Sequence, residues 1–297
     1  MAHDHPHHHQ HSARSRTLAW TLGANGVLLV AMIIGGAVFG SLALWADAAH
    51  QATDVVGLCV AALAFRAATR PGDGRFTYGL KRVEVLGALT NAVLLVASGV
   101  WIAIEALRRL GDDSHIEGVG VIVLASIALV INGGGALGLR RHAGSNLNLR
   151  AAVTHLAIDA LGSVVVLGVG IAVQVADATW TDPAASLLLS ALVLHQGWRL
   201  LRGATAVLLE AAPGEQSADT LAALMATHPD VEDVHHVHVW SIDSETAALT
   251  AHVVVDRTTL HEAQRVSRDL EVLLEERGIE HSTLSLECHM CDEPLHR

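Results

Sequence analysis

The hydrophobic positions of the chain gather into six long runs before residue 208, and after it they alternate with polar positions. A helix needs about 20 apolar residues to cross the hydrocarbon core of a membrane. The runs reach that length. They predict a first span with its exit turn within residues 17–46 and further spans over residues 42–65, 85–104, 118–139, 151–176 and 183–208. The pattern therefore predicts a polytopic α-helical membrane protein with six transmembrane helices.

The pattern after residue 208 is typical of a small α+β domain. Apolar residues at helical spacing predict helices over residues 217–228 and 260–277, and Val-rich alternating segments predict strands over 231–242, 247–256 and 279–287. This α-β-β-α-β order indicates a ferredoxin-like fold. We therefore expect three parts: a His-rich tail (1–16), a transmembrane domain (17–208) and a ferredoxin-like domain (209–297).

Composition supports this division. Hydrophobic residues make up 51% of the chain, charged residues only 16%, and the mean hydropathy is +0.41. An ordinary soluble domain is about a quarter charged, so a soluble globular protein and a disordered one are both excluded. Residues 208–297 hold 18 acids against five arginines, a formal charge of −13. Such a segment repels phosphates, and we expect cations as partners, no nucleic acid and no organic cofactor.

The basic residues outside that segment set the expected orientation. Twelve of the 14 fall on the side of the membrane that holds both termini of a six-span chain, and only Arg108 and Arg109 fall on the other. Positive charge collects in cytoplasmic loops. We therefore expect a multi-pass protein of the cytoplasmic (inner) membrane, surrounded by lipid, with both termini in the cytoplasm.

Two of the predicted spans carry ionisable side chains in the same H-x-x-x-D pattern. His50 and Asp54 lie in the second span, and His155 and Asp159 lie in the fifth. Residues four apart lie on one face of a helix, one turn apart. Two such faces brought together supply two nitrogens and two oxygens. This four-ligand set suits Zn²⁺ better than Mg²⁺ or Ca²⁺, which prefer oxygen ligands alone.

Other interpretations of these four residues remain. Each pair could hydrogen-bond only within its own helix, or the four could relay protons without metal. Ionisable groups inside a membrane are costly and indicate function by default, and two copies on separate spans favour a metal site. Two Asp carboxylates balance one Zn²⁺, and without metal they favour proton uptake. We therefore expect metal and protons to compete for the site.

Four segments give the chain a resemblance to a known family. They are residues 46–54 with ADAAH and Asp54, residues 75–89 (RFTYGLKRVEVLGAL), the pair His155 and Asp159, and residues 237–240 (VHVW). Over nearly its whole length the chain resembles the cation diffusion facilitator family, in its bacterial zinc and cadmium exporter branch.

This resemblance implies a homodimer with six spans per protomer, a cytoplasmic ferredoxin-like domain, and Zn²⁺/H⁺ antiport out of the cytoplasm. It also implies that His at the first position of each quartet goes with zinc and cadmium, and cobalt is a further candidate substrate. Some members hold a second metal in the loop between spans two and three. Here that loop has Asp73 but no His, so we expect none there.

The resemblance also implies a regulatory metal site on the strands of the C-terminal domain. Its expected Zn²⁺ ligands are His235, His252 and Glu287, and Cys288 and Cys291 beside them have metal-ligand spacing. The other histidines of this domain are expected to be solvated: His236, His238, His261 and His281.

The N-terminal tail holds six histidines: His3, His5, His7, His8, His9 and His11. An affinity tag is one interpretation, but the longest run is three, which favours a natural metal-capturing tail. For the whole chain, a secondary metal/proton antiporter is the leading hypothesis, and a membrane-bound zinc sensor without transport is the alternative. An enzyme is not expected, because the sequence has no P-loop motif and no H-E-x-x-H.

Overall fold

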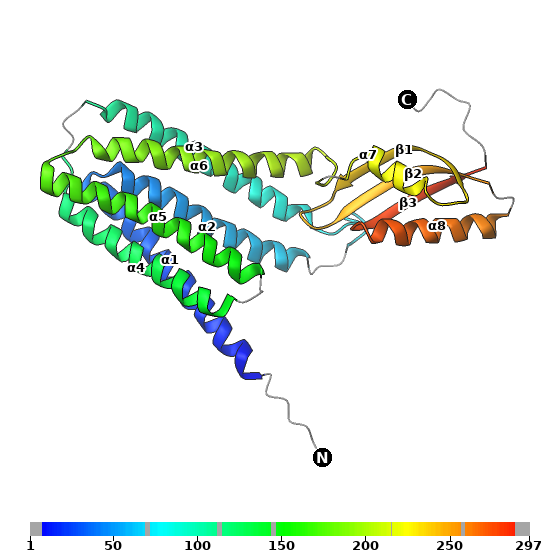
Figure 1. Ribbon diagram of the computed structural model, residues 1–297, viewed down its shortest axis with the longest axis horizontal. Coiled ribbons are helices and arrows are strands. Elements are labelled where there is room, and N and C mark those ends of the chain that lie inside the picture. The colour runs from blue at the N-terminus through cyan, green and yellow to red at the C-terminus, as the bar shows by residue number, and fades with distance from the viewer. Residues whose placement is uncertain are drawn as a thin grey trace, which may run out of the picture. The chain divides into compact units, whose positions relative to one another are not determined.

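The computed structural model describes residues 8–68, 72–111, 115–143, 147–214, 216–256 and 259–288. Within these residues six long helices come first, followed by a small α/β domain (Figure 1). The long helices are α1 (His8–Phe39), α2 (Leu42–Ala68), α3 (Arg82–Arg109), α4 (Gly118–Ala143), α5 (Leu147–Ala176) and α6 (Thr181–Leu208). The later elements are α7 (Ala218–Met225), β1 (Val231–Ser241), β2 (Ala247–Val255), α8 (Leu260–Glu275) and β3 (Ile279–Glu287).

The chain divides into two compact units. One comprises Met1–Cys59 with Thr90–Arg199, and the other comprises Val60–Leu89 with Leu200–Arg297. Helices α2, α3 and α6 therefore contribute residues to both.

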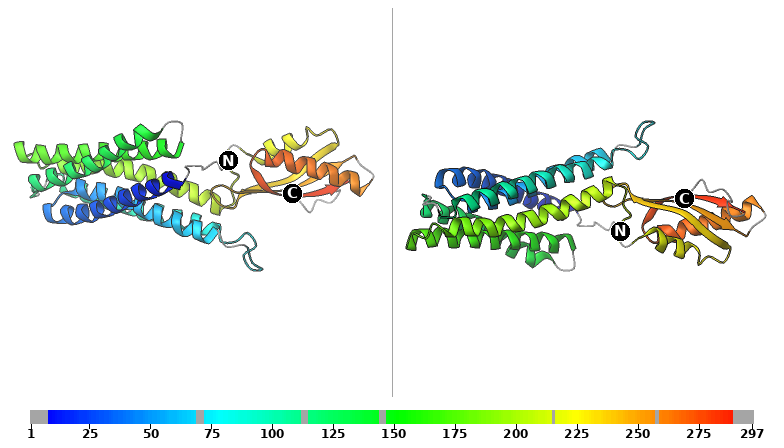
Figure 2. Two further views of the ribbon diagram at one scale, coloured as in Figure 1. Left: turned by 90° about the horizontal axis from the view of Figure 1, so that it is seen from below. Right: turned by 90° about the horizontal axis from the view of Figure 1, so that it is seen from above.

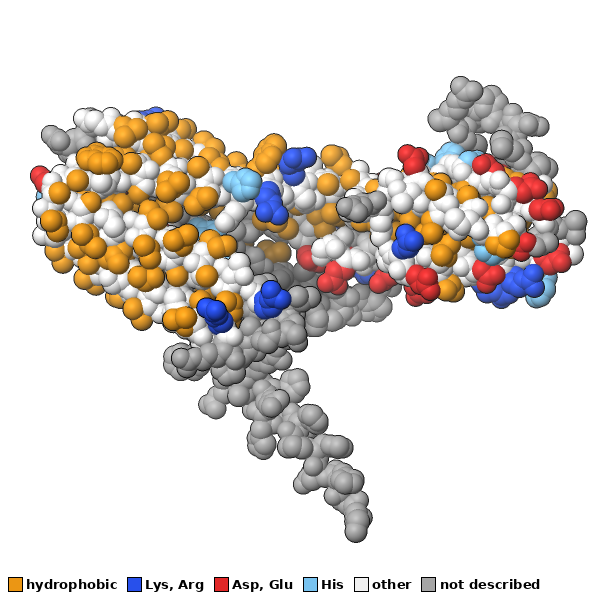
Figure 3. Space-filling view, viewed as in Figure 1, with side chains coloured by type: hydrophobic (Ala, Val, Ile, Leu, Met, Phe, Trp, Pro, Cys, Tyr) orange, Lys and Arg blue, Asp and Glu red, His pale blue; other side chains and the backbone are white. Residues whose placement is uncertain are grey.

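The helical unit has the surface expected of a membrane protein. Among the described residues four segments are long and apolar enough to cross a membrane: Arg82–Arg109, Gly118–Arg140, Val153–Ala176 and Thr181–Leu208. A shorter apolar segment, Asn25–Phe39, lies within α1. Large apolar side chains cover the outer surface of these helices (Figure 3), and Val130, Leu137 and Val175 are each at least 65% exposed. Such exposure is unfavourable in water and suits lipid.

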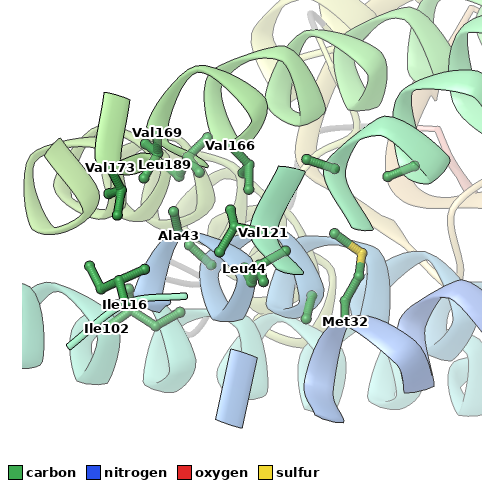
Figure 4. Close-up of a cluster of buried hydrophobic side chains, with 14 of the residues drawn as sticks. Met32, Ala43, Leu44, Ile102, Ile116, Val121, Val166, Val169, Val173 and Leu189 are labelled. Atoms are coloured by element: carbon green, nitrogen blue, oxygen red, sulfur yellow. The ribbon is translucent and has the colours of Figure 1, made fainter. Parts of the chain in front are cut away.

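The interior of this unit is filled by small and branched apolar side chains (Figure 4). Met32 of α1, Leu44 of α2, Val121 of α4 and Val166 of α5 are almost fully buried in one cluster. Helix α4 packs most extensively against α5 and also contacts α1.

The first two helices meet within the uncharged run over residues 17–46. That run predicts one span and its exit turn, and the structure agrees: α1 ends at Phe39 and α2 begins at Leu42, where the second span is predicted to start. Gly40 between them has a φ of 72°, a left-handed conformation that glycine adopts at little cost. A turn made by Gly and Ser does not interrupt a hydropathy profile, so the uncharged run continues through it.

The C-terminal domain has the predicted order of elements. Its sheet has the strand order β1-β2-β3, with β1 antiparallel and β3 parallel to the central strand β2. Helices α7 and α8 cover one face (Figure 2), where Val266, Leu270 and Leu274 of α8 pack on Leu249 and Val253 of β2. The predicted fold class, a helical membrane domain with an α+β domain, is confirmed.

Candidate functional site

The described residues of the two H-x-x-x-D pairs meet between helices α2 and α5. His50 Nε2 lies 3.1 Å from Asp159 Oδ1, and His155 Nε2 lies 3.5 Å from Asp159 Oδ2. The two imidazole rings are 6.2 Å apart between centroids. The Asp159 carboxylate therefore has one imidazole at each oxygen, one from each helix.

Burial differs among these three side chains. Asp159 is 11% exposed and His50 is 16% exposed, whereas His155 is 45% exposed. A carboxylate this far from water needs a cation, a proton or hydrogen-bond donors. The position of Asp159 thus favours a site that exchanges positive charge.

The fourth predicted ligand, Asp54, lies on α2 one turn after His50, but its side chain is outside the described residues. The position of α2 at this level is fixed by neighbouring helices. Asn91 Nδ2 of α3 donates to the carbonyl of Thr53 at 3.4 Å, and Gln51 Nε2 donates to Asn25 Oδ1 of α1 at the same distance.

A further carboxylate on the same part of α2 was not assigned a role from the sequence. Asp47 lies three residues before His50, is 8% exposed, and approaches Gly162 of α5 closely. A Cβ on Gly162 would lie 3.3 Å from Asp47 Oδ1, so glycine leaves room for this carboxylate between the helices. The spacing i, i+3 to His50 was the available signal.

A second group of ligand atoms lies on the sheet of the C-terminal domain. One nitrogen each from His235 and His252 and one oxygen from Glu287 all lie within 4.8 Å of one another. His252 Nδ1 is 2.5 Å from Glu287 Oε1, and His235 Nε2 is 3.5 Å from Glu287 Oε2. Register explains the arrangement, because His235 pairs with His252 across the strands and Glu287 ends β3 beside Val254.

The chemistry of these three residues fits a divalent cation. Glu287 Oε2 is buried and has no hydrogen-bond partner among the residues that the structure describes, and imidazole with carboxylate is a donor set that zinc accepts. Asp233, which sequence reasoning missed, accepts a hydrogen bond from His235 Nδ1 at 3.1 Å. A carboxylate on the far nitrogen is the usual outer partner of a metal-binding imidazole. The spacing of two residues along one strand was the signal for it.

The remaining predicted ligands are only partly described. Cys288 follows β3 with an exposed side chain, and Cys291 is outside the described residues. His3, His5 and His7 are also outside them, and His8, His9 and His11 lie in α1 with their side chains outside the described part.

Two acids near the start of α3 have pKa values below their usual range. In the loop before α3, the backbone N–H groups of Phe76 and Arg75 donate to Asp73 and lower its pKa. Burial raises the pKa of Asp243, but hydrogen bonds from Glu245 and Thr246, together with the charge of Lys81, outweigh it and lower the pKa overall. Asp73 thus organises a turn.

Comparison with known proteins finds family matches along nearly the whole chain. The cation efflux transmembrane domain family matches residues 18–209, and the cytoplasmic domain family of cation efflux proteins matches residues 212–287. The metal cation efflux system protein CzcD of Cupriavidus metallidurans is 34% identical over 98% of this chain and 91% of its own length. The zinc transporter ZitB of Escherichia coli is 35% identical over 99% of this chain and 95% of its own.

A third relative, the cadmium, cobalt and zinc/H(+)-K(+) antiporter of Bacillus subtilis, is 30% identical over 95% of this chain and 91% of its own length. Both domains and the full-length similarity agree with the apolar helices and the α+β domain described above. This chain is an integral membrane protein of the cation diffusion facilitator family, the cation efflux transporters.

Proposed function

We propose that this protein exports divalent metal from the cytoplasm in exchange for protons. The substrate is Zn²⁺, with Cd²⁺ and Co²⁺ as further substrates, as the names of the relatives suggest. His50, Asp54, His155 and Asp159 bind it, and the site opens alternately to the two sides of the membrane. The observation that carries the proposal is the Asp159 carboxylate placed between two imidazoles from two membrane helices.

The charges of these groups couple metal to protons. Two carboxylates neutralise one Zn²⁺, so the loaded site has little net charge in a medium of low dielectric constant. Without the metal, buried carboxylates favour their protonated form, and imidazoles must lose a proton before they ligate. Metal and protons therefore compete for the same atoms, and alternating access converts this competition into exchange.

Zinc flux into proteoliposomes, with and without a pH gradient, tests the transport reaction. We expect flux that depends on the gradient and disappears in Asp54→Ala and Asp159→Ala. His50→Ala is compared with His195→Ala, because His195 is an exposed imidazole on α6 that the proposal does not use. Equal flux in Asp159→Ala and the wild type would contradict the site.

Proton release provides an independent measurement. Calorimetry of Zn²⁺ binding in buffers with different ionisation enthalpies gives the number of protons released per ion. We expect fewer protons to be released in Asp159→Ala than in the wild type, because the transport site no longer contributes, and an unchanged number in His195→Ala. Binding without any proton release would contradict the exchange mechanism.

The C-terminal site supports a regulatory role for metal in the same protein. His235, His252 and Glu287 hold a Zn²⁺ ion there, and Asp233 orients His235. Cys288 and Cys291, which follow Glu287 in the sequence, are candidates for a further ligand. The same cluster favours the alternative of a membrane-bound zinc sensor. Metal binding to the purified protein without flux in proteoliposomes would support the sensor and exclude the exporter.

The proposal extends to the assembly, the location and the charged segments of the protein. The protein is a homodimer in the inner membrane with both termini in the cytoplasm, and it divides into residues 1–16, 17–208 and 209–297. The histidines of the N-terminal tail collect cations, and the acidic C-terminal domain attracts them by its charge.

A further inference from the structure

Strand β1 contains a bulge at its pair of adjacent histidines. His235 pairs with His252 and His238 pairs with Thr250, so His236 and Val237 together stand opposite the single residue Ala251. His236 has a φ of 53°, a left-handed conformation that only a few per cent of residues other than Gly adopt, with Asn, Asp and His the most frequent among them. A bulge with such a residue adds one position to a strand and redirects the side chains around it.

The bulge leaves the imidazoles of His235 and His238 on the same face of the sheet as that of His252. In an unbroken strand, side chains alternate between the faces, so a strand with Val234 toward the core would also turn His236 and His238 toward it. The structure instead packs Val237 and Val239 against the core as well as Val234. The histidines on either side of the bulge are thereby left on the opposite face, with His252.

The rings on that face are in mutual contact. His236 stacks on His252 with 5.3 Å between ring centroids and 30° between planes, and it meets His238 at 4.9 Å. His235 is 5.5 Å from His252. His236 is half-buried while His238 is exposed. Of these two histidines, His236 is therefore the one that lies closer to the metal cluster residue His252.

The metal cluster described above leaves one position to fill. His235, His252 and Glu287 are three protein ligands, and zinc in a structural site takes four. A residue other than glycine in the left-handed conformation has a strained backbone, and such residues cluster at functional sites. The left-handed backbone of His236 and its ring contact with His252 are separate observations, and the contact places its imidazole next to one of the three ligands.

We propose that His236 is a further metal ligand and completes a four-ligand site with His235, His252 and Glu287. The site accepts Zn²⁺ or a divalent cation of similar ligand preference. This assignment rests on the regulatory site proposed above and adds to it a ligand that the sequence pattern indicates as solvated surface. The bulge is then the element that builds the site.

The test uses the full-length protein in detergent, with Asp54→Ala and Asp159→Ala in every sample to remove the transport site. Zn²⁺ is titrated against a chromophoric chelator, and the N-terminal tail is common to all samples. The test variants are His236→Asn and His236→Gly, because both residues tolerate a left-handed backbone. His261→Asn is the matched control, since His261 is an exposed residue of α8, and His235→Ala removes an accepted ligand.

We expect both His236 variants to weaken the binding of one Zn²⁺ ion by about tenfold or more, the scale on which single groups around a metal act. The metal-free His236→Gly protein should melt at the same or a higher temperature than its parent, because glycine relieves the strained backbone. Loss of affinity together with unchanged or increased stability separates a ligand from a structural residue. His261→Asn should match its parent in both measurements.

Three results would overturn the assignment. Unchanged affinity in the His236 variants, with loss in His235→Ala, would show that the three-residue site binds without His236. Loss of affinity in Cys288→Ser but not in the His236 variants would assign the fourth position to Cys288. A lower melting temperature of metal-free His236→Gly would indicate a structural role. Unchanged affinity in His235→Ala would instead refute the regulatory site itself.

Discussion

Asp182, in the first turn of α6, holds the start of α2 through a buried carboxylate. Its Oδ1 accepts hydrogen bonds from Ser41 Oγ at 2.5 Å and from the backbone N–H of Ala43 at 3.2 Å, and its Oδ2 accepts one from Leu42 N–H at 2.8 Å. Asp182 and Ser41 have no exposed surface. An anion at a helix N-terminus also interacts favourably with the helix dipole.

Replacing Asp182 by Ala leaves two buried backbone N–H groups of α2 without an acceptor. An unsatisfied buried donor costs about 1–3 kcal/mol, so we expect a loss of roughly 2–6 kcal/mol of stability by the same principle. For a chain of this size, 1 kcal/mol corresponds to about 2–4 °C in melting temperature. Asp182→Ala should therefore melt at least about 4 °C below the wild type, and Asp182→Asn, which keeps one oxygen, should fall between them.

Thermal unfolding in detergent, followed by the fluorescence of the six tryptophans, measures this difference. Asp177→Asn is the matched control, because Asp177 is an exposed acid shortly before α6, and Asn tolerates its φ of 51°. If Asp182→Ala melted within about 2 °C of Asp177→Asn, the carboxylate would contribute less than one buried hydrogen bond. The reasoning would then be wrong.

Three further predictions concern the other charged groups. Asp233→Asn should weaken Zn²⁺ binding at the C-terminal site by about 10–100-fold while transport through the membrane site continues; equal affinity in chelator competition would exclude the orienting role of Asp233 on His235. Because the folded-state pKa of Asp243 lies below its ordinary value of 3.8, the hydrogen bonds that it accepts from Glu245 and Thr246, together with the charge of Lys81, stabilise the fold above that pH and lose this effect as the pH falls through the folded-state pKa. The stability difference between wild type and Asp243→Asn should therefore shrink as the pH is lowered below 3.8 in thermal melts, and a constant difference would contradict it. Deleting residues 1–11 should raise the apparent KM for zinc more than it lowers kcat in flux assays, whereas complete loss of transport would refute a capture role.

The elements of the C-terminal domain could be predicted closely because their patterns are local. The strand predicted over residues 279–287 coincides with β3, and the helix predicted to begin at residue 260 is α8 (Leu260–Glu275). In α8 the buried residues Val266, Leu270 and Leu274 repeat every four positions, which a helix period requires. Hydropathy likewise located the long helices, because lipid allows few charges along them.

The contacts of the proposed transport site could be predicted from the sequence only within one helix. The spacing of four residues puts His155 and Asp159 on one face of α5, and the structure has them 3.5 Å apart. The shorter distance, 3.1 Å, joins Asp159 to His50 on α2, so hydrogen bonding confined to each helix is not what the structure shows. Contacts of this kind depend on how helices pack. For the same reason no sequence pattern indicated that Asp182 accepts hydrogen bonds from residues about 140 positions earlier.

The histidines of β1 show why alternation fails at a bulge. An unbroken strand over residues 234–239 (VHHVHV) could turn either its even-numbered or its odd-numbered side chains toward the core. Both orientations would bury at least one imidazole and expose at least one valine. One extra residue at His236 satisfies all three valines, because Val234, Val237 and Val239 then pack against the same core. The strained backbone of His236 is offset by that burial, since each buried Val contributes roughly 1.5–3 kcal/mol and a left-handed residue costs about 1–2 kcal/mol. The same bulge that buries the valines therefore collects the histidines on the opposite face, where a metal can use them.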